Sequence, residues 1–268
     1  MMRDGVRHLR DMSDPEFDEL CWHLGSTGGD IIPSNSKVNL KIDGCSLRMG
    51  NDGGEFFIES SRSGHQTVPG AFSQFTKGKR GKADKISVSY DTVLWALRQH
   101  RPLQELLGFL PGIKLFCELL YTPLAERDKG RSTVKFLVTE YEEEALGRLM
   151  TLVFYKAEDF AGYPVSDEGR IFNRLKGLSD NMVRIYDQRV CFDRFQVSDL
   201  VVRALGPCPP RDALKREMRD RILNSDFSHP LKGKDFEGLV FYVGHHVFKI
   251  VTDSYTEGKK SRDSEFKR

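Results

Sequence analysis

The stretch "NLKIDGCSLRMG" places a lysine and an aspartate in a run that otherwise has the pattern of a buried strand. Residues two apart in a strand point to the same side, so we expect Lys41 and Asp43 to face together. The apolar residues Leu40 and Ile42 would then turn into the opposite layer. Gly44 follows at once and lets the backbone turn close to whatever Lys41 contacts.

This arrangement suggests a chemistry for the lysine. A lysine amine is a nucleophile only when it is neutral, and its ordinary pKa is about 10.4. Partial burial or a nearby cation lowers that pKa, and a phosphorus centre held by a divalent metal is a suitable electrophile. The stretch can therefore be interpreted as a preorganised amine beside a carboxylate. The alternative is an edge-strand Lys41 whose ammonium reaches solvent and pairs with Asp43.

Five further motifs follow in order along the chain. They are "ESSRSG" with Arg62, "LFCELLY" with Glu118, "TLVFYKA" with Phe154, "FEGLVFYVG" with Glu237 and "HVFKIVTDSY" with Lys249. Together with "KIDG", they resemble the ordered motifs of the covalent nucleotidyltransferase superfamily, which contains polynucleotide ligases and mRNA-capping enzymes. The resemblance covers residues 37–255 and is closer to the adenylyltransferase domain of phage RNA ligases than to DNA ligases, so a viral origin is expected.

The resemblance implies an ATP-dependent ligase that works through a lysyl-AMP intermediate. Lys41 would attack the α-phosphate of ATP and release pyrophosphate. The AMP would pass to the 5′-phosphate end of a polynucleotide, and a 3′-hydroxyl would then displace it. A covalent step of this kind stores an activated phosphate in a site that excludes water. RNA is expected as the substrate more than DNA.

The resemblance also assigns roles near the nucleophile. Lys249 would be the second catalytic residue and would neutralise the α-phosphate as charge builds in the transition state. Asp43 and Gly44 would belong to the nucleotide site beside Lys41. Arg62 would contact the ribose or, later, the 5′-phosphate, because a planar guanidinium suits phosphate oxygens.

The remaining motif residues would hold the base, the ribose and the metal. Glu118 would accept a hydrogen bond from a ribose hydroxyl. Phe154 would stack on adenine, with Tyr155 on the other face of the strand as the alternative. Glu237 would bind Mg²⁺ or Mn²⁺ through water, because magnesium keeps much of its hydration shell. Each also has a plainer interpretation, as a strand-end carboxylate in an ion pair or as a core aromatic.

The stretch "TKGKRGKADK" predicts a basic loop that could grip the phosphate backbone of a nucleic acid. A solvated run of charge is the alternative. The histidines of the later stretch "GHH" lie at a predicted turn, and we expect both to be exposed. The residues concerned are Lys77, Lys79, Arg80, Lys82 and Lys85 in the loop, and His245 and His246 at the turn.

Two features depart from the family pattern. The last motif usually carries two lysines flanking one residue, and here Val251 stands at the second position. This removes a positive charge expected near the phosphates, for which Lys259 or Lys260 could substitute. The chain also ends soon after Val251, without room for the OB or helical domain found in many relatives. We therefore expect a minimal ligase, a shortened chain, or a partner that supplies the missing domain.

The surrounding pattern predicts the elements that position these residues. Ser13 and Glu16 fit a capping box that begins a helix over 13–24. "KVNLKID" alternates like a strand, and "NDGG" predicts a hairpin into "EFFIESS". Further expected elements are helical structure over 91–108, strands over 112–121 and 149–157, and a hairpin over 236–251.

The later part of the chain has a different pattern. "EGRIFNRLKGLSDNMVRIYDQ" and "PRDALKREMRDRILNS" resemble amphipathic helices, so we expect a helical lobe over 158–225. A flexible tail is expected from residue 256. The fold class that the resemblance implies is α+β, with an ATP-grasp-like core of two antiparallel β-sheets flanked by helices. It would form one domain over 1–268 without an OB domain.

Composition limits the classes of protein that fit. The chain has 268 residues, 39% of them apolar, and a net charge of +2, so a nucleic-acid contact must come from a local patch. The five scattered cysteines contain no CxxC pair and indicate neither a disulfide framework nor a cysteine zinc site. Without a signal-peptide pattern or an apolar run near the ~20 residues that span a bilayer, we expect a cytoplasmic protein, in the host cytoplasm if it is viral.

Three functions stay open on the sequence alone. The first is an ATP-dependent ligase for nucleic acids with 5′-phosphate and 3′-hydroxyl ends, acting in nucleic-acid repair. The second is a GTP-dependent, capping-type guanylyltransferase. The third is a catalytically impaired, ligase-like protein that only binds nucleic acid, which Val251 and the absent C-terminal domain favour.

Overall fold

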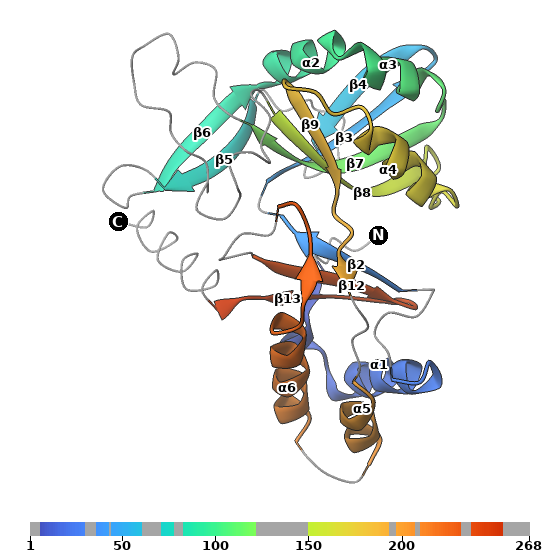
Figure 1. Ribbon diagram of the computed structural model, residues 1–268, viewed down its shortest axis with the longest axis vertical. Coiled ribbons are helices and arrows are strands. Elements are labelled where there is room, and N and C mark those ends of the chain that lie inside the picture. Colours follow the sequence, from blue (N-terminus) through green and yellow to red (C-terminus); the bar gives the residue numbers. More distant parts are fainter. Residues whose placement is uncertain are drawn as a thin grey trace. The chain divides into compact units, whose positions relative to one another are not determined.

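The computed structural model describes residues 6–29, 36–42, 44–60, 71–77, 83–121, 150–192, 197–206, 210–231 and 237–253. They divide into two compact units, the first within Met1–Ile42 and Gln188–Lys260 and the second within Asp43–Asp187. Within these described residues, each unit has one main β-sheet and three α-helices (Figure 1). The expected α+β class of two sheets flanked by helices is confirmed, although each sheet also contains one parallel strand pair. The expected single domain over 1–268 stays a prediction.

The first unit has a four-stranded sheet in the order β1-β13-β12-β2. Its strands are β1 (Arg7–His8), β2 (Ser36–Lys41), β12 (Gly238–Val243) and β13 (His246–Val251). Its helices are η1 (Leu9–Asp11), α1 (Asp14–Ser26), α5 (Ser198–Leu205) and α6 (Arg211–Leu223). A short antiparallel pair joins β10 (Cys191–Phe192) to β11 (Phe227–Ser228). Figure 1 shows α1, α5 and α6 gathered on one side of the four-stranded sheet.

The two faces of this sheet differ because side chains alternate along each strand. One face is apolar and buried. It carries Leu40 of β2, Phe241 of β12 and Phe248 of β13, and the two phenyl rings stack with centroids 5.0 Å apart. The opposite face carries Lys41 and Lys249, which follow Leu40 and Phe248 in their strands. The core of the unit therefore occupies one side of the sheet, and the candidate chemistry lies on the other.

Further backbone segments are hydrogen-bonded to β13 and β2 of this sheet. On one edge, β1 pairs in parallel with β13 and places His8 opposite Lys249. On the other edge, the amide of Leu40 in β2 donates to the carbonyl oxygen of Gln188 at 2.7 Å. Strands β13 and β2 are therefore each hydrogen-bonded on both sides next to a lysine of the candidate site.

The second unit has a five-stranded sheet in the order β4-β3-β7-β8-β9. Its strands are β3 (Cys45–Asp52), β4 (Glu55–Ser60), β7 (Ile113–Tyr121), β8 (Met150–Asp159) and β9 (Val183–Asp187). The helices are α2 (Tyr90–Gln99), α3 (Arg101–Gly108) and α4 (Glu168–Lys176), and a separate hairpin joins β5 (Ala71–Lys77) to β6 (Ala83–Ser89). Buried residues from one face of the five-stranded sheet and from these three helices form the core of the unit.

Local sequence signals are confirmed where they were strongest. The amide of Glu16 donates to Oγ of Ser13, and the amide of Ser13 donates to the Glu16 carboxylate at 2.9 Å, which completes the capping box of α1. The β3–β4 hairpin turns at Gly53 and Gly54, both with positive φ. The helical structure expected over 91–108 is formed by two helices, α2 and α3, and Pro102 lies in the first turn of α3. Among the described residues, no helix has the length and apolar character needed to cross a membrane.

The segment 158–225 contains α4, α5 and α6, but it is not helical throughout. Residues Val183–Asp187, expected to continue a helix, instead form β9, which runs parallel to β8. Val183 and Ile185 alternate into the core between partly exposed residues, which is the pattern of a strand. The two halves of the segment also fall in different compact units. The basic stretch 76–85 includes the ends of β5 and β6, and the expected flexible tail lies outside the described residues.

The capping box gives a direct test of the first unit. We expect Ser13→Ala to lower the free energy of unfolding by about 1 kcal/mol, because the Glu16 amide loses its acceptor. Ser13→Asp keeps an acceptor at this position and should stay close to wild type. Urea unfolding followed by circular dichroism measures both variants. Equal loss in the two would contradict the role of the cap.

Candidate functional site

The end of β2 holds the candidate nucleophile beside a buried carboxylate. Lys41 is the last residue of β2, and its ammonium forms an ion pair with Oε1 of Glu237, the residue that precedes β12. The side chain of Glu237 is 2% exposed, whereas that of Lys41 is 25% exposed. The carboxylate is therefore enclosed, while the lysine remains accessible to a ligand.

Gly238 sets the position of Glu237. It pairs with Lys41 on one side and with Val251 on the other. Its φ is 152°, and a Cβ added there would clash with the carbonyl oxygen of Ile250 and lie 2.9 Å from the Cα of Val251. The glycine of "EGLV" is thus required by the close approach of β13, and it brings the preceding carboxylate beside the lysine.

The other carboxylate oxygen of Glu237 is a candidate metal ligand. Oε2 is buried and has no hydrogen-bond partner among the described residues. Leaving such an oxygen buried and unpaired costs free energy, which a cation or its bound water would offset. Carboxylate oxygens suit Mg²⁺ and Mn²⁺. The described residues therefore fit the divalent metal that the motif implies.

Lys249 and Asn39 lie on the same face as Lys41. The register places Val240 directly between Asn39 of β2 and Lys249 of β13. Lys249 is partly exposed, whereas Asn39 is fully buried, and neither amide atom of Asn39 has a partner among the described residues. A buried amide of this kind can bind a polar ligand. Our sequence analysis missed Asn39, for which the available signal was a polar residue within the alternating stretch "KVNLKID".

The pKa of His8 reflects the positive charge on this face. Burial lowers the pKa of His8, and the positive charges of Lys249, Arg10 and Lys41 lower it further, while Asp11 acts in the opposite direction. The His8 imidazole is consequently held toward its neutral form. The positive charge of the face thus comes from its lysines and favours ligands that carry phosphate.

A basic pocket of 220 Å³ lies beside Lys249 and is lined by η1, β13 and α6. Six of its lining residues are basic in type and one is acidic. Guanidinium and ammonium groups gathered around a pocket suit a phosphate or another oxyanion. The basic residues are His8, Arg10, Lys215, Arg216, Arg219 and Lys249, and the acid is Asp253.

Helix α6 supplies a cation close to the unusual valine. Val251 belongs to the row that runs from Lys41 through Gly238, so it stands on the site face. Arg219 donates from Nη2 to the carbonyl oxygen of Val251 at 3.4 Å and pairs with Asp253 at 2.6 Å. The expected substitutes in the tail lie outside the described residues. Arg219 therefore places a cation next to Val251, and the carboxylate of Asp253 balances part of its charge.

In the second unit, Glu118 shares a sheet face with two polar groups. Glu118 of β7 lies opposite Ser46 of β3, whose hydroxyl is 3.2 Å from the hydroxyl of Tyr155. Gly44 packs against the same part of β7. A Cβ at Gly44 would lie 3.0 Å from the carbonyl oxygen of Leu119 and 3.2 Å from Cβ of Glu118. The glycine of "KIDG" therefore allows the chain to approach Glu118 closely.

Phe154 requires a correction. Its side chain is fully buried, and its ring centroid lies 6.1 Å from that of Phe172 in α4. A ring enclosed by core side chains offers no face for adenine, so the expected stacking role is wrong. Tyr155 is partly exposed and is the extra residue where the register between β7 and β8 shifts. Such bulges redirect side chains, which makes Tyr155 the better candidate.

Several expected site residues fall outside the described part of the chain, and their roles stay predictions. For Lys77, at the end of β5, only the backbone is described. Residues without a described position are Asp43, Arg62, Lys79, Arg80 and Lys82.

Comparison with known proteins gives a structural likeness only. No protein-family profile and no curated protein sequence matches this chain. Among solved structures, it is similar to Naegleria gruberi RNA ligase: a lysine mutant with AMP and Mn (TM-score 0.48, 13% identity), another with ATP and Mn (0.48, 14%), and the ligase with PPi (0.47, 15%). Each match covers 98% of this chain but only 59% of the ligase chain, so our sequence spans less than two thirds of that protein's length.

The close approach at Gly238 predicts a stability effect. We expect Gly238→Ala to destabilise the protein by about 3 kcal/mol, because the new Cβ combines an unfavourable φ with a backbone clash. Gly53→Ala is a matched control, since Gly53 has a φ of 59° but nothing within 4 Å of an added Cβ. It should cost only about 1 kcal/mol. Thermal unfolding distinguishes the variants, and similar midpoints would contradict the packing described for β13.

Proposed function

We propose that this protein is an ATP-dependent polynucleotide ligase that forms a lysyl-AMP intermediate on Lys41 and acts on RNA in preference to DNA. The observation that supports this most is the ion pair between Lys41 and the buried Glu237, on a sheet face shared with Lys249. These residues come from three motifs that are far apart in the sequence. The fold of the first unit gathers the three motifs on adjacent strands.

The first chemical step would use Lys41 as a neutral amine. Its Nζ would attack the α-phosphorus of ATP, forming a nitrogen–phosphorus bond. The bond from that phosphorus to the bridging oxygen would break, and pyrophosphate would leave with the electron pair. The ammonium proton must depart before the attack, and the Glu237 carboxylate is in direct contact with it. Lys249 would stabilise the negative charge on the α-phosphate.

Glu237 would serve both the lysine and the metal. Oε1 pairs with Lys41, while Oε2 has no partner among the described residues. A bound Mg²⁺ or Mn²⁺ would neutralise phosphate charge and polarise the reacting phosphorus centre. Because Mg²⁺ keeps several waters, one carboxylate is a reasonable share of its ligands from the protein.

The later steps would transfer AMP to a 5′-phosphate and then join that end to a 3′-hydroxyl with release of AMP. We assign Glu118 to a ribose hydroxyl and Tyr155, in place of Phe154, to the adenine. Asp43 and Arg62 keep their expected roles in the nucleotide site. Joining of DNA, a role in repair, a phage origin and a partner that supplies a further domain stay predictions.

A second candidate function follows from Val251. A valine on the site face lacks the charge that a second lysine would bring near the phosphates. This favours a catalytically impaired protein that retains nucleic-acid binding. The GTP-dependent capping-type activity is a third possibility, and a change of nucleotide separates it from the ligase.

Covalent labelling tests the proposed intermediate. Wild-type protein incubated with α-labelled ATP and Mg²⁺ or Mn²⁺ should acquire one AMP, which mass spectrometry should locate on Lys41. Lys41→Ala should lose the label, because no other amine takes its place. Lys37→Ala is the matched control, since Lys37 lies on the same strand and face and contacts the ring of Tyr242. It should keep most of the label.

The same assay contains the contrary outcomes. Folded wild-type protein that takes no label from ATP, or Lys41→Ala that labels like wild type, would contradict the ligase proposal. Labelling by GTP alone would indicate a capping-type enzyme. Salt-dependent RNA binding without any label would support the impaired protein.

The basic pocket predicts a contribution to RNA binding. Arg216 is exposed at the pocket, and Arg216→Ala should weaken RNA binding by removing one phosphate contact. The slope of log affinity against log salt should become less steep by about 0.7 for single-stranded RNA. Arg203→Ala is the control, because Arg203 pairs with Glu217 and does not line the pocket. Unchanged RNA affinity and salt slope in Arg216→Ala would exclude the pocket from the RNA-binding surface.

A further inference from the structure

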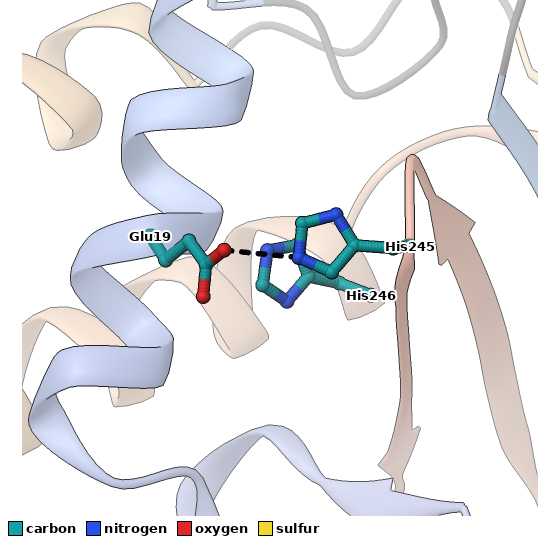
Figure 2. Close-up of side chains that lie close together, drawn as sticks. All are labelled: Glu19, His245 and His246. Carbon is teal, nitrogen blue, oxygen red and sulfur yellow. Dashed lines mark hydrogen bonds and ion pairs between the residues drawn. The ribbon is translucent and has the colours of Figure 1, made fainter.

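A second group of chemistry-bearing side chains lies at the tip of the β12–β13 hairpin. His245 is in the turn, His246 begins β13, and Glu19 projects from α1 toward both (Figure 2). The three residues each offer a potential ligand atom, and these atoms all lie within 4.8 Å of one another. All three belong to the first unit. The proposed ligase chemistry uses none of them.

The two histidines differ in environment, which corrects the expectation that both are exposed. His245 is 68% exposed and donates from Nε2 to Oε1 of Glu19 at 3.0 Å. His246 is only 8% exposed, and its Nε2 is buried with no hydrogen-bond partner among the described residues. The two imidazole rings have centroids 4.1 Å apart. A buried nitrogen without a partner is thus held beside an imidazole and a carboxylate.

This combination is poorly explained by a simple ion pair. The contact between Glu19 and His245 satisfies those two groups, but it leaves the buried nitrogen of His246 unpaired. Protonating both rings would place two positive charges in contact. A metal ion would give this nitrogen the partner that the ion pair does not supply. Neutral imidazole is the form that binds a metal.

The spacing also suits metal coordination. Zinc binds imidazole nitrogen and carboxylate oxygen at about 2.0–2.2 Å, so tetrahedral ligand atoms lie about 3.4 Å apart. The ligand atoms here are already within 4.8 Å. Glu19 and His245 have exposed side chains that can close this difference by rotation, while His246 is fixed by packing.

The backbone of the hairpin tip is fixed against α1. Gly244 has a φ of 57°, and a Cβ there would lie 2.7 Å from the imidazole of His23. His23 is one helical turn beyond Glu19, so the same face of α1 receives the turn and carries the acid. The positions of the acid and the two imidazoles are consequently set by a packed helix and a glycine turn.

We propose that Glu19, His245 and His246 form a binding site for a divalent transition metal of the zinc class, which links α1 to the β12–β13 hairpin. Water would take the fourth position. Two imidazoles and one carboxylate are a ligand set that zinc commonly accepts, and imidazole disfavours Mg²⁺. The inference does not depend on the proposed ligase function.

This site is distinct from the candidate metal position at Glu237. The two positions lie at opposite ends of β12, separated by six residues of strand, or about 20 Å. Oxygen ligands at one end and imidazoles at the other predict different metals.

Metal binding can be measured without any assay of activity. Untagged protein stripped with a chelator should bind one Zn²⁺ in calorimetric titration, and Co²⁺ should give the visible absorption of a tetrahedral site. Glu19→Gln and His245→Ala, both at exposed side chains, should each weaken Zn²⁺ binding by more than about 100-fold, since loss of even an outer partner costs ~10–100-fold. Zn²⁺ should also raise the thermal midpoint of wild type but not of these variants.

Glu105→Gln is the matched control, because Glu105 is exposed on a different helix and lies outside the cluster. It should bind Zn²⁺ like wild type. The proposal is overturned if stripped wild type binds no Zn²⁺, or if Glu19→Gln and His245→Ala bind it with unchanged affinity and stoichiometry. His246→Ala is a further variant, and it is informative if circular dichroism shows that it folds.

Discussion

The ion pair between Lys41 and Glu237 is the contact on which the proposed chemistry of the first unit depends. A buried carboxylate is unfavourable unless a cation or hydrogen bonds compensate it. Here the acid is almost fully enclosed, while the lysine keeps a quarter of its side chain exposed. This asymmetry keeps the amine at a defined position and still lets a ligand reach it. The same acid retains one oxygen for a second positive partner.

The sheet around this pair separates packing from chemistry. Alternate residues of β2, β12 and β13 either enter the apolar core or face the side of the two lysines. Gly238 is the point where these requirements meet, because its missing side chain permits the approach of β13 and the placement of Glu237. Positive charge from β13, η1 and α6 then extends from the lysines into the basic pocket. The result is a positively charged surface that favours the binding of anions and is supported by the packed sheet.

The sequence predicted features that local rules determine. Ser13 with Glu16 predicted the start of α1, and the alternation of "KVNLKID" predicted that Leu40 would face the layer opposite to Lys41. Features that depend on register between strands were not predictable in this way. Phe154 was assigned to a ligand because alternation alone cannot reveal the bulge that turns Tyr155 outward. Strand β9 was predicted as helix because its stability comes from pairing with β8, which the local sequence does not reveal. The burial of Asn39 and His246 likewise depends on segments that are distant in the sequence.

The backbone contacts along β2 and β13 have a consequence for the accuracy of strand pairing. Strands can slide past one another, and a slip of a single residue exchanges the two faces. In this sheet, such a shift would turn Lys41 and Lys249 into the apolar core. It would place Leu40 and Phe248 on the face that carries the candidate site. The backbone hydrogen bond from Leu40 to Gln188 fixes β2 beside Lys41, and the pairing of β1 with β13 fixes β13 beside Lys249. Residues that have no role in the proposed reaction thereby maintain the strand register.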